Sequence, residues 1–250
     1  MGTNHKVTSS RPCLTDKMHT SSAKESGFGW SSGNWSGYAI RGKKQAFRQI
    51  SGEWMVPFVR PSAKAAYSSA WIGIDGYGNS SLIQTGTGHE SVNGIVHYYA
   101  WWEILPAAET VIPYPVSPGD RMQALIIRTS PGKWMIQLRN LSRHWVFRTT
   151  QRYSGPQASA EWIVEAPQVN GSIAGLARLS PVCFSRCRVN GKSPKLKSSD
   201  GGIMIQNKHK VAVPSRPNTR GDAFTVKRPC KNVLPPVHSK LPIQYIHSRK

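Results

Sequence analysis

Acidic residues are scarce in this chain. Its 250 residues include 12 Asp and Glu against 33 Lys and Arg, which gives a formal net charge of +21. Such a balance is typical of proteins that meet nucleic acid, an anionic cell wall or a membrane surface. The basic residues are scattered, without the long like-charged runs or the basic amphipathic helix of a binding segment. We therefore expect no nucleic-acid partner, while contact with an anionic wall or surface stays open.

Long hydrophobic runs and metal motifs are missing as well. No stretch approaches the ~18 apolar residues of a membrane helix, and residues 1–27 lack the apolar core of a secretory signal. The chain has four cysteines, no His-Glu-x-x-His and no Gly-rich phosphate loop. We expect no membrane span, metal or cofactor, and the spacing of Cys183 and Cys187 leaves a disulfide between them open.

Convincing helical patterns are also absent, and short β-branched and aromatic runs separated by Gly, Pro, Asn and Ser take their place. This pattern predicts an all-β domain over residues 28–228, a sandwich or barrel. Residues 1–27 are interpreted as a disordered leader or propeptide-like segment, and residues 229–250 as an extended basic tail. The predicted strands are 37–42, 47–56, 69–75, 81–86, 95–105, 121–129, 133–140, 144–153, 159–166, 202–212 and 223–227.

Some of the few acidic residues stand in or beside the most aromatic strands. Because strand side chains alternate between faces, Trp71 should share a face with Asp75, and Tyr99 and Trp101 should share one with Glu103. Glu161 and Glu165 should likewise share a face of their strand. Burial against aromatic rings raises a carboxyl pKa, which is one route to an acid-base catalyst. The alternative for each carboxylate taken singly is a solvated position on the wet face of a sheet.

Eight short segments, in order, resemble the glutamic peptidases, or eqolisins. They are NWSGY (34–38), SGEWMVP (51–57), AWIGIDG (70–76), LIQTG (82–86), YAWWEILP (99–106), PGD (118–120), NLS (140–142) and AEWIVE (160–165). With a weaker match through SSDGGIMIQ and GDAFTV, the resemblance covers about residues 30–227. A Tyr at position 99, where fungal members tend to carry Asp, is similar to the bacterial type of the family.

The resemblance implies an antiparallel β-sandwich of two sheets, a lectin-like (concanavalin-type) jelly roll with the substrate cleft on its concave sheet. It also implies a secreted, monomeric acid endopeptidase that pepstatin does not inhibit, with polypeptide substrates. Gln84 in LIQTG and Glu165 in AEWIVE take the catalytic positions. Positions for substrate binding fall on Trp71, Asp75, Tyr99, Trp101 and Glu103. The sequence pI of about 10.3 departs from the usual acidic character of secreted acid peptidases.

Glu165 and Gln84 together supply what peptide hydrolysis needs. A Glu carboxylate can take a proton from water and pass it to the leaving amine, and a Gln amide can orient that water and hydrogen-bond the oxyanion. One alternative is a β-sandwich glycoside hydrolase or carbohydrate-binding protein that uses Glu103 and Glu165, with Trp71, Trp101 and Trp102 stacked on sugar rings. Another is an inactive protein whose basic surface binds an anionic polymer.

Overall fold

The structure is a computed structural model that describes residues 7–8 and 27–229. Within these residues the chain consists of β-strands and one turn of 3-10 helix, η1 (Ser198–Asp200), with no α-helix. The prediction of an all-β, mainly antiparallel fold is confirmed. In the described part of the chain, no helix has the length and apolar character needed to cross a membrane.

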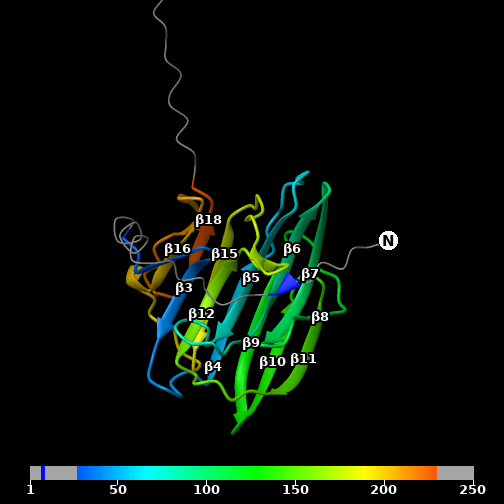
Figure 1. Cartoon of the computed structure of the whole chain (residues 1–250). Coiled ribbons are helices and arrows are strands. Elements are labelled where there is room, and N and C mark those ends of the chain that lie inside the picture. Colours follow the sequence, from blue (N-terminus) through cyan, green and yellow to red (C-terminus); the bar gives the residue numbers. More distant parts are fainter. Residues whose placement is uncertain (1–6, 9–26, 230–250) are drawn as a thin grey trace, which may run out of the picture.

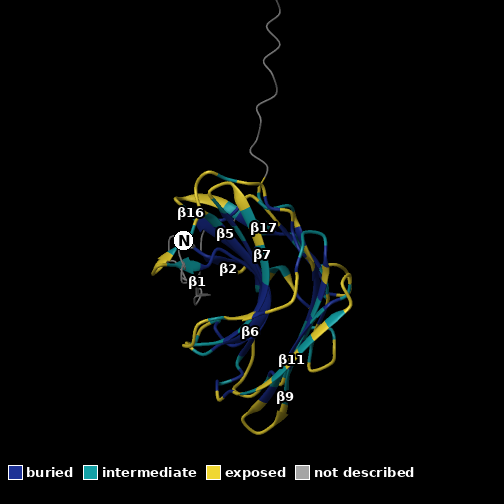
Figure 2. Ribbon diagram, turned by 90° about the vertical axis from the view of Figure 1, so that its right-hand side faces the viewer, coloured by how far each residue is buried: buried dark blue, intermediate teal, exposed yellow. Residues whose placement is uncertain are grey.

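The strands form two curved layers that face each other (Figures 1 and 2). The first layer contains, in spatial order, β2 (Trp30–Ser32), β16 (Gly201–Gln206), β3 (Trp35–Arg41), β12 (Ser159–Glu165), β5 (Ala66–Ile74), β6 (Ile83–Val92), β7 (Ile95–Ile104) and β8 (Thr110–Ile112). The second contains β11 (Trp145–Arg152), β10 (Lys133–Asn140), β9 (Arg121–Ser130), β4 (Gln49–Met55), β15 (Val182–Val189), β18 (Phe224–Lys227) and β17 (His209–Pro214). Because β17 also pairs with β16, the two layers are continuous at that edge.

A third, small sheet joins distant parts of the chain. It contains β1 (Val7–Thr8), β13 (Gln168–Val169) and β14 (Ser172–Ile173). β1 pairs with β13 in antiparallel register, and β13 begins three residues after β12 ends. This sheet therefore lies close to the C-terminal end of β12.

Apolar side chains from both layers fill the space between them. Tyr38 and Ile72 of the first layer and Trp134 of the second belong to one cluster of buried residues. Two indole groups also link the layers by hydrogen bonds, since Trp162 Nε1 donates to the Ser51 carbonyl at 3.0 Å and Trp54 Nε1 donates to Thr87 Oγ1 at 3.1 Å. These bonds satisfy the polar ends of large buried rings and fix how the layers sit on each other.

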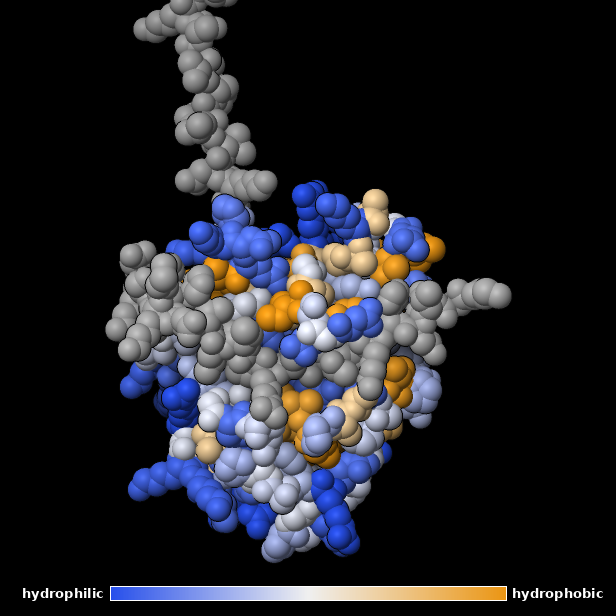
Figure 3. Space-filling view, viewed as in Figure 1, coloured by the Kyte–Doolittle hydropathy of each residue, from blue (hydrophilic) through white to orange (hydrophobic). Residues whose placement is uncertain are grey.

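The opposite face of the first layer carries a second apolar cluster, and we call it the site face. Its buried members are Trp30, Trp35, Ala39, Trp71, Leu82, Trp101 and Ile163. A sheet with one face in solvent carries polar side chains on that face. The large buried rings found here instead indicate a binding or catalytic site. Viewed onto this layer, hydrophobic patches lie mainly in the middle and to the right, and strongly hydrophilic residues gather along the upper and lower margins (Figure 3).

Two sequence-based expectations need correction, and one possibility that the sequence left open is not realised. Segment 202–212 is two strands, β16 and β17, because Asn207 and Lys208 both adopt positive φ (49° and 64°) and form a tight hairpin turn. The strand predicted at 81–86 continues to residue 92 as β6. Cys183 and Cys187 form no disulfide; Cys183 is exposed and Cys187 is buried within β15, a strand that the sequence did not predict.

Candidate active site

The two predicted catalytic residues stand on β6 and β12 of the first layer, with β5 between these two strands. Gln84 lies on β6, directly opposite Gly73 of β5 and Glu103 of β7. Glu165 is the last residue of β12 and lies opposite Ser69 of β5. Strand alternation places Gln84, Glu103 and Glu165 on the site face with Trp71, and all four are fully buried.

Gln84 and Glu103 form a hydrogen-bonded pair across β6 and β7. Gln84 Nε2 donates to Glu103 Oε2 at 2.5 Å. Gln84 Oε1 and Glu103 Oε1 are buried and find no hydrogen-bond partner among the described residues. A buried polar atom left without a partner costs roughly 1–3 kcal/mol, a cost that catalytic sites commonly carry. The pair thus offers two unused oxygens and one further amide hydrogen.

Glu165 is oriented by two nitrogen donors. Trp71 Nε1 donates to Glu165 Oε2 at 2.8 Å, and Asn34 Nδ2 donates to Glu165 Oε1 at 3.3 Å. Asn34 is itself held, because its Oδ1 accepts a hydrogen bond from Ser32 Oγ at 2.8 Å. Asn34 stands in the NWSGY segment, but its contact with Glu165 joins positions 131 residues apart and could not be deduced from spacing.

The indole of Trp71 connects the two halves of the site. A Cβ atom built on Gly73 would come within 2.9 Å of the Trp71 ring and 3.3 Å of Gln84 Cβ, so a glycine at position 73 makes room for the ring beside Gln84. Gly86 likewise leaves space for the backbone and Cβ of Trp71. Trp35 packs edge-on against the ring, with centroids 4.8 Å apart. Trp71 thus bonds Glu165 at one end and packs near Gln84 at the other.

Glu103 is kept in its protonated form by its surroundings. Burial raises the pKa of Glu103 to about 9, with the charge of Glu165 as the next contribution, while the hydrogen bond from Gln84 acts against the rise. At acid and neutral pH the carboxyl therefore carries its proton. Since Oε2 accepts from Gln84, the proton belongs on Oε1, where it becomes a donor on the site face.

Tyr99 joins two further carboxyl groups beside this pair. Its hydroxyl donates to Glu90 Oε1 at 3.0 Å, and it also hydrogen-bonds Glu109. Burial raises the pKa of Glu109 to about 8, with a smaller contribution from the charge of Glu90. A Cβ on Gly88 would meet the Tyr99 ring at 2.3 Å, so the ring lies directly over this glycine.

Glu90 and Glu109 received no role from the sequence. Alternation along β6 puts residues 84, 86, 88 and 90 on one face and could have placed Glu90 beside Gln84. The strand was, however, predicted to end at residue 86. The glycines at positions 86 and 88 are poor strand formers, which hid the continuation. Glu109 precedes β8, a short strand that periodicity cannot detect.

Asp75 does not share the face of Trp71 as predicted. It follows the last residue of β5 with a φ of +72°, so the strand alternation ends before it. Its carboxylate accepts hydrogen bonds from Tyr153 Oη at 2.6 Å, Asn79 Nδ2 at 3.1 Å, and the backbone N–H groups of residues 157 and 158 at 2.7 and 2.8 Å. In the structure Asp75 therefore fixes the segment that leads into β12.

Trp101 and Glu161 complete the site face. Trp101 pairs with Gly86, and its Nε1 is buried without a partner among the described residues. Glu161 is fully buried opposite Gly73, and burial raises its pKa well above the usual range. No cluster of His, Cys, Asp and Glu in residues 27–229 is arranged to hold a metal ion. The site is therefore a set of carboxyl, carboxamide and indole groups.

Comparison with known proteins identifies the class to which this arrangement belongs. The model of the peptidase A4 family matches residues 33–228, and the chain belongs to this family, the eqolisins or glutamic peptidases. The protein is a glutamic endopeptidase, which confirms the activity implied by the sequence.

Individual relatives agree with this assignment. Aspergillopepsin-2 from Aspergillus niger is 26% identical over 222 residues, which cover 78% of this chain and 77% of the relative. Scytalido-glutamic peptidase, solved with a peptide-based transition-state analogue, is 25% identical with a TM-score of 0.66, covering 78% of this chain and 98% of its own. Aspergilloglutamic peptidase from Aspergillus niger has a TM-score of 0.55 at 23% identity, and the match covers 65% of this chain and 99% of that structure's chain. These structures confirm the predicted β-sandwich.

Proposed function

We propose that this protein cleaves polypeptides with Glu165 as general base and then general acid, and with Gln84 as the group that orients water and stabilises the oxyanion. The observation that carries the proposal is the shared site face, where Trp71 bonds Glu165 and packs beside Gln84. A carboxylate and a carboxamide on one face, with the same indole beside both, support the proposal that they act on one water molecule.

The first step forms the tetrahedral intermediate. Glu165 takes a proton from a water molecule that Gln84 Oε1 helps to orient, and the water oxygen attacks the peptide carbonyl carbon. The carbonyl oxygen becomes an oxyanion as its π bond breaks. The second hydrogen of Gln84 Nε2 and the proton on Glu103 Oε1 are the donors available to it.

The second step releases the products. Protonated Glu165 gives its proton to the amine nitrogen, the carbon–nitrogen bond breaks, and the oxyanion collapses to a carbonyl. The new terminal carboxyl group and the free amine leave, and Glu165 returns to its carboxylate form. In these two steps no residue of the protein forms a covalent bond to the substrate.

Acid pH is compatible with this chemistry. Glu103 and Glu109 hold their protons up to pKa values of about 9 and 8, so both are neutral where Glu165 must be ionised to act as base. A site face with fewer negative charges accepts a peptide carbonyl and its developing oxyanion more readily. Trp101 and Tyr99 on the same face are proposed contacts for the substrate chain. An extracellular location is likewise proposed, on the strength of the family alone.

A digest of an unfolded protein substrate tests the proposal. At about pH 4, near the ordinary pKa of Glu, the purified protein is expected to cleave the substrate in the presence of pepstatin. The Glu165→Gln variant is expected to fold and to show no cleavage. Glu53→Gln is the matched control, because Glu53 is a buried carboxylate on the second layer. Cleavage by the Glu165→Gln variant at the wild-type rate would contradict this mechanism.

A further inference from the structure

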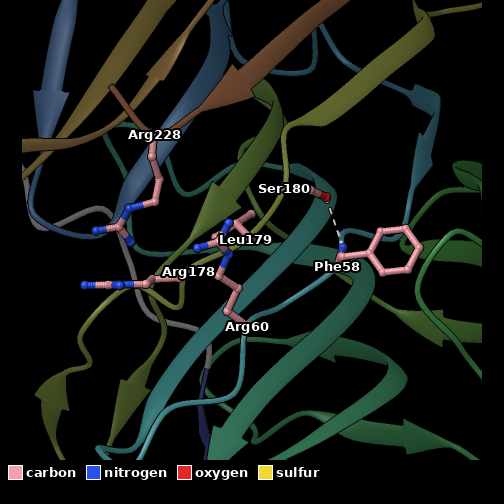
Figure 4. A pocket seen from close by; sticks show the side chains of 6 residues that line it. All are labelled: Phe58, Arg60, Arg178, Leu179, Ser180 and Arg228. Carbon is pink, nitrogen blue, oxygen red and sulfur yellow. Dashed lines mark hydrogen bonds between the residues drawn. The ribbon is translucent and has the colours of Figure 1, made fainter. Parts of the chain in front are cut away.

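Three arginine side chains meet in a hollow away from the Gln84–Glu165 pair. The hollow has a volume of about 350 Å³, near the lower end of small-molecule sites. Arg60 comes from the connection between β4 and β5, Arg178 from the connection between β14 and β15, and Arg228 follows the last residue of β18. In Figure 4, Arg178 and Arg228 extend side by side in one direction, and Arg60 extends in another, ending beside Leu179.

The backbone brings these segments together in a fixed arrangement. The Arg60 N–H donates to the Arg178 carbonyl at 2.8 Å, and Val59 and Leu179 form an antiparallel bridge. Beside this bridge, the N–H of Phe58 donates a hydrogen bond to Ser180 Oγ at 3.0 Å, as drawn in Figure 4. The hollow is therefore built by a short two-stranded contact and does not depend on one flexible loop.

Arg228 is fixed by its own hydrogen bonds. Its Nη1 donates to the carbonyls of Leu176 and Ala177 at 3.0 and 3.1 Å. These two bonds use one end of the guanidinium, which leaves its other nitrogens as donors. Burial and the neighbouring charge of Arg178 lower the pKa of Arg228. A positive charge is therefore held in place close to another positive charge.

No carboxylate of the described residues balances this charge. The ion pairs found within residues 27–229 involve Glu53 and Asp120 and none of these three arginines. Residues 229–250, which follow Arg228 directly, contain no Asp or Glu. A second hollow of about 480 Å³, on the second layer, differs in this respect, because Glu53 and Asp222 line it beside Arg186 and Arg220.

We propose that the hollow of Arg60, Arg178 and Arg228 is a binding site for a phosphate group. Guanidinium groups match tetrahedral oxyanions by paired N–H donors, and several of them from different directions can surround one. Arg60 and Arg178 are exposed, so a ligand reaches them from solvent. Because arginine keeps its charge at every working pH, the site also functions where the peptidase is active.

Calorimetric titration of the full chain with inorganic phosphate, in a buffer without other multivalent anions, tests the site. The double variant Arg60→Gln/Arg178→Gln is expected to bind about a hundredfold more weakly, since each of the two lost charge-assisted hydrogen bonds carries about a tenfold effect. Arg220→Gln is the matched control, because it removes one arginine from the second hollow. It is expected to retain wild-type affinity at one phosphate per chain.

Two further probes distinguish the source of the phosphate group. A phosphoserine peptide that outcompetes inorganic phosphate, and loses this advantage in the double variant, would indicate a group carried on a polypeptide. Tripolyphosphate that does the same would indicate a free polyphosphate. Equal phosphate binding by wild type and double variant would overturn the proposal. Equal weakening by Arg220→Gln would also overturn it, because binding would then follow net charge alone.

Discussion

Carboxyl groups occur on both layers of the sandwich, but their neighbours differ. On the second layer, Glu53 accepts from Arg121 at 3.3 Å and Arg186 at 3.4 Å. On the site face, neither Glu103 nor Glu161 has a Lys or Arg partner within salt-bridge distance among the described residues, although the chain carries 33 such residues.

The difference shows how one chain can use the same side chain for two purposes. A carboxylate with cationic partners keeps its charge, and it stabilises the fold modestly. A carboxyl buried without such partners retains its proton, since desolvation disfavours the charged form. Keeping cations away from the site face thus creates proton donors there in a protein of charge +21. Four substitutions test this comparison.

Gln84→Ala is expected to have the largest effect. Loss of one oxyanion donor lowers turnover about 10²–10³-fold, which corresponds to ~2.7–4 kcal/mol of transition-state stabilisation. The initial rate of cleavage of an unfolded substrate at acid pH measures it, and circular dichroism checks the fold. Gln137→Ala provides the control, because Gln137 is a buried glutamine on β10 of the second layer. Equal losses in both variants would contradict a specific role for Gln84.

Glu103→Gln is expected to change how stability depends on pH. The pKa of Glu103 is raised to about 9, and an unfolded Glu titrates near 4.3. Between these values the unfolded chain releases a proton that the folded chain retains, so wild-type stability falls as pH rises through this window. Glutamine keeps the hydrogen bond and cannot ionise. Near pH 8 the variant should therefore be more stable by on the order of 5 kcal/mol.

Urea unfolding of both proteins at about pH 4.5 and pH 8 measures this effect. Near pH 4.5 the two should be similar, because Glu103 is protonated in the folded state and the unfolded side chain, close to its ordinary pKa, is still roughly 40% protonated. Comparing the two proteins at each pH cancels the repulsion among basic groups, which grows in acid. Parallel pH dependence in the two proteins would show that Glu103 is not held neutral.

The sequence predicts the site better than it predicts the limits of the strands. Alternation correctly places Trp101 with Glu103, and Glu161 with Glu165, because these runs are regular and uninterrupted. It fails for Asp75, where a positive φ ends the alternation, and for Glu90, which lies beyond two glycines. Both failures occur where a ring or a turn requires a backbone that strand periodicity does not describe.

Long-range contacts also escaped the sequence. Two contacts depend on how separate strands are ordered in the layers. One is the hydrogen bond between Asn34 and Glu165, and the other is the shared hollow of Arg60, Arg178 and Arg228. Local patterns fix which face a side chain takes, but they leave strand order open. Family resemblance supplied that missing information for Gln84 and Glu165, the proposed catalytic pair.

Trp71→Phe should have a smaller effect on catalysis than Gln84→Ala. The phenyl ring keeps the packing against Trp35 but loses the 2.8 Å bond to Glu165. Because Trp71 positions Glu165, kcat should fall about tenfold with little change in KM. Trp134→Phe is a suitable control, since Trp134 Nε1 is buried on the second layer without a partner among the described residues. Similar losses of kcat in the two variants would argue against positioning by Trp71.

Glu53→Gln should have the smallest effect. The side chains of Arg121 and Arg186 are 57% and 70% exposed, so water and salt screen their attraction to Glu53. Glutamine can keep the bond with Gln123, and the expected loss of unfolding free energy at neutral pH is at most about 1 kcal/mol. Urea unfolding with and without about 1 M salt should show this difference shrinking, because the Debye length is then about 3 Å. Loss of several kcal/mol, or of proteolysis, would mean that the two layers do not use their carboxyl groups differently.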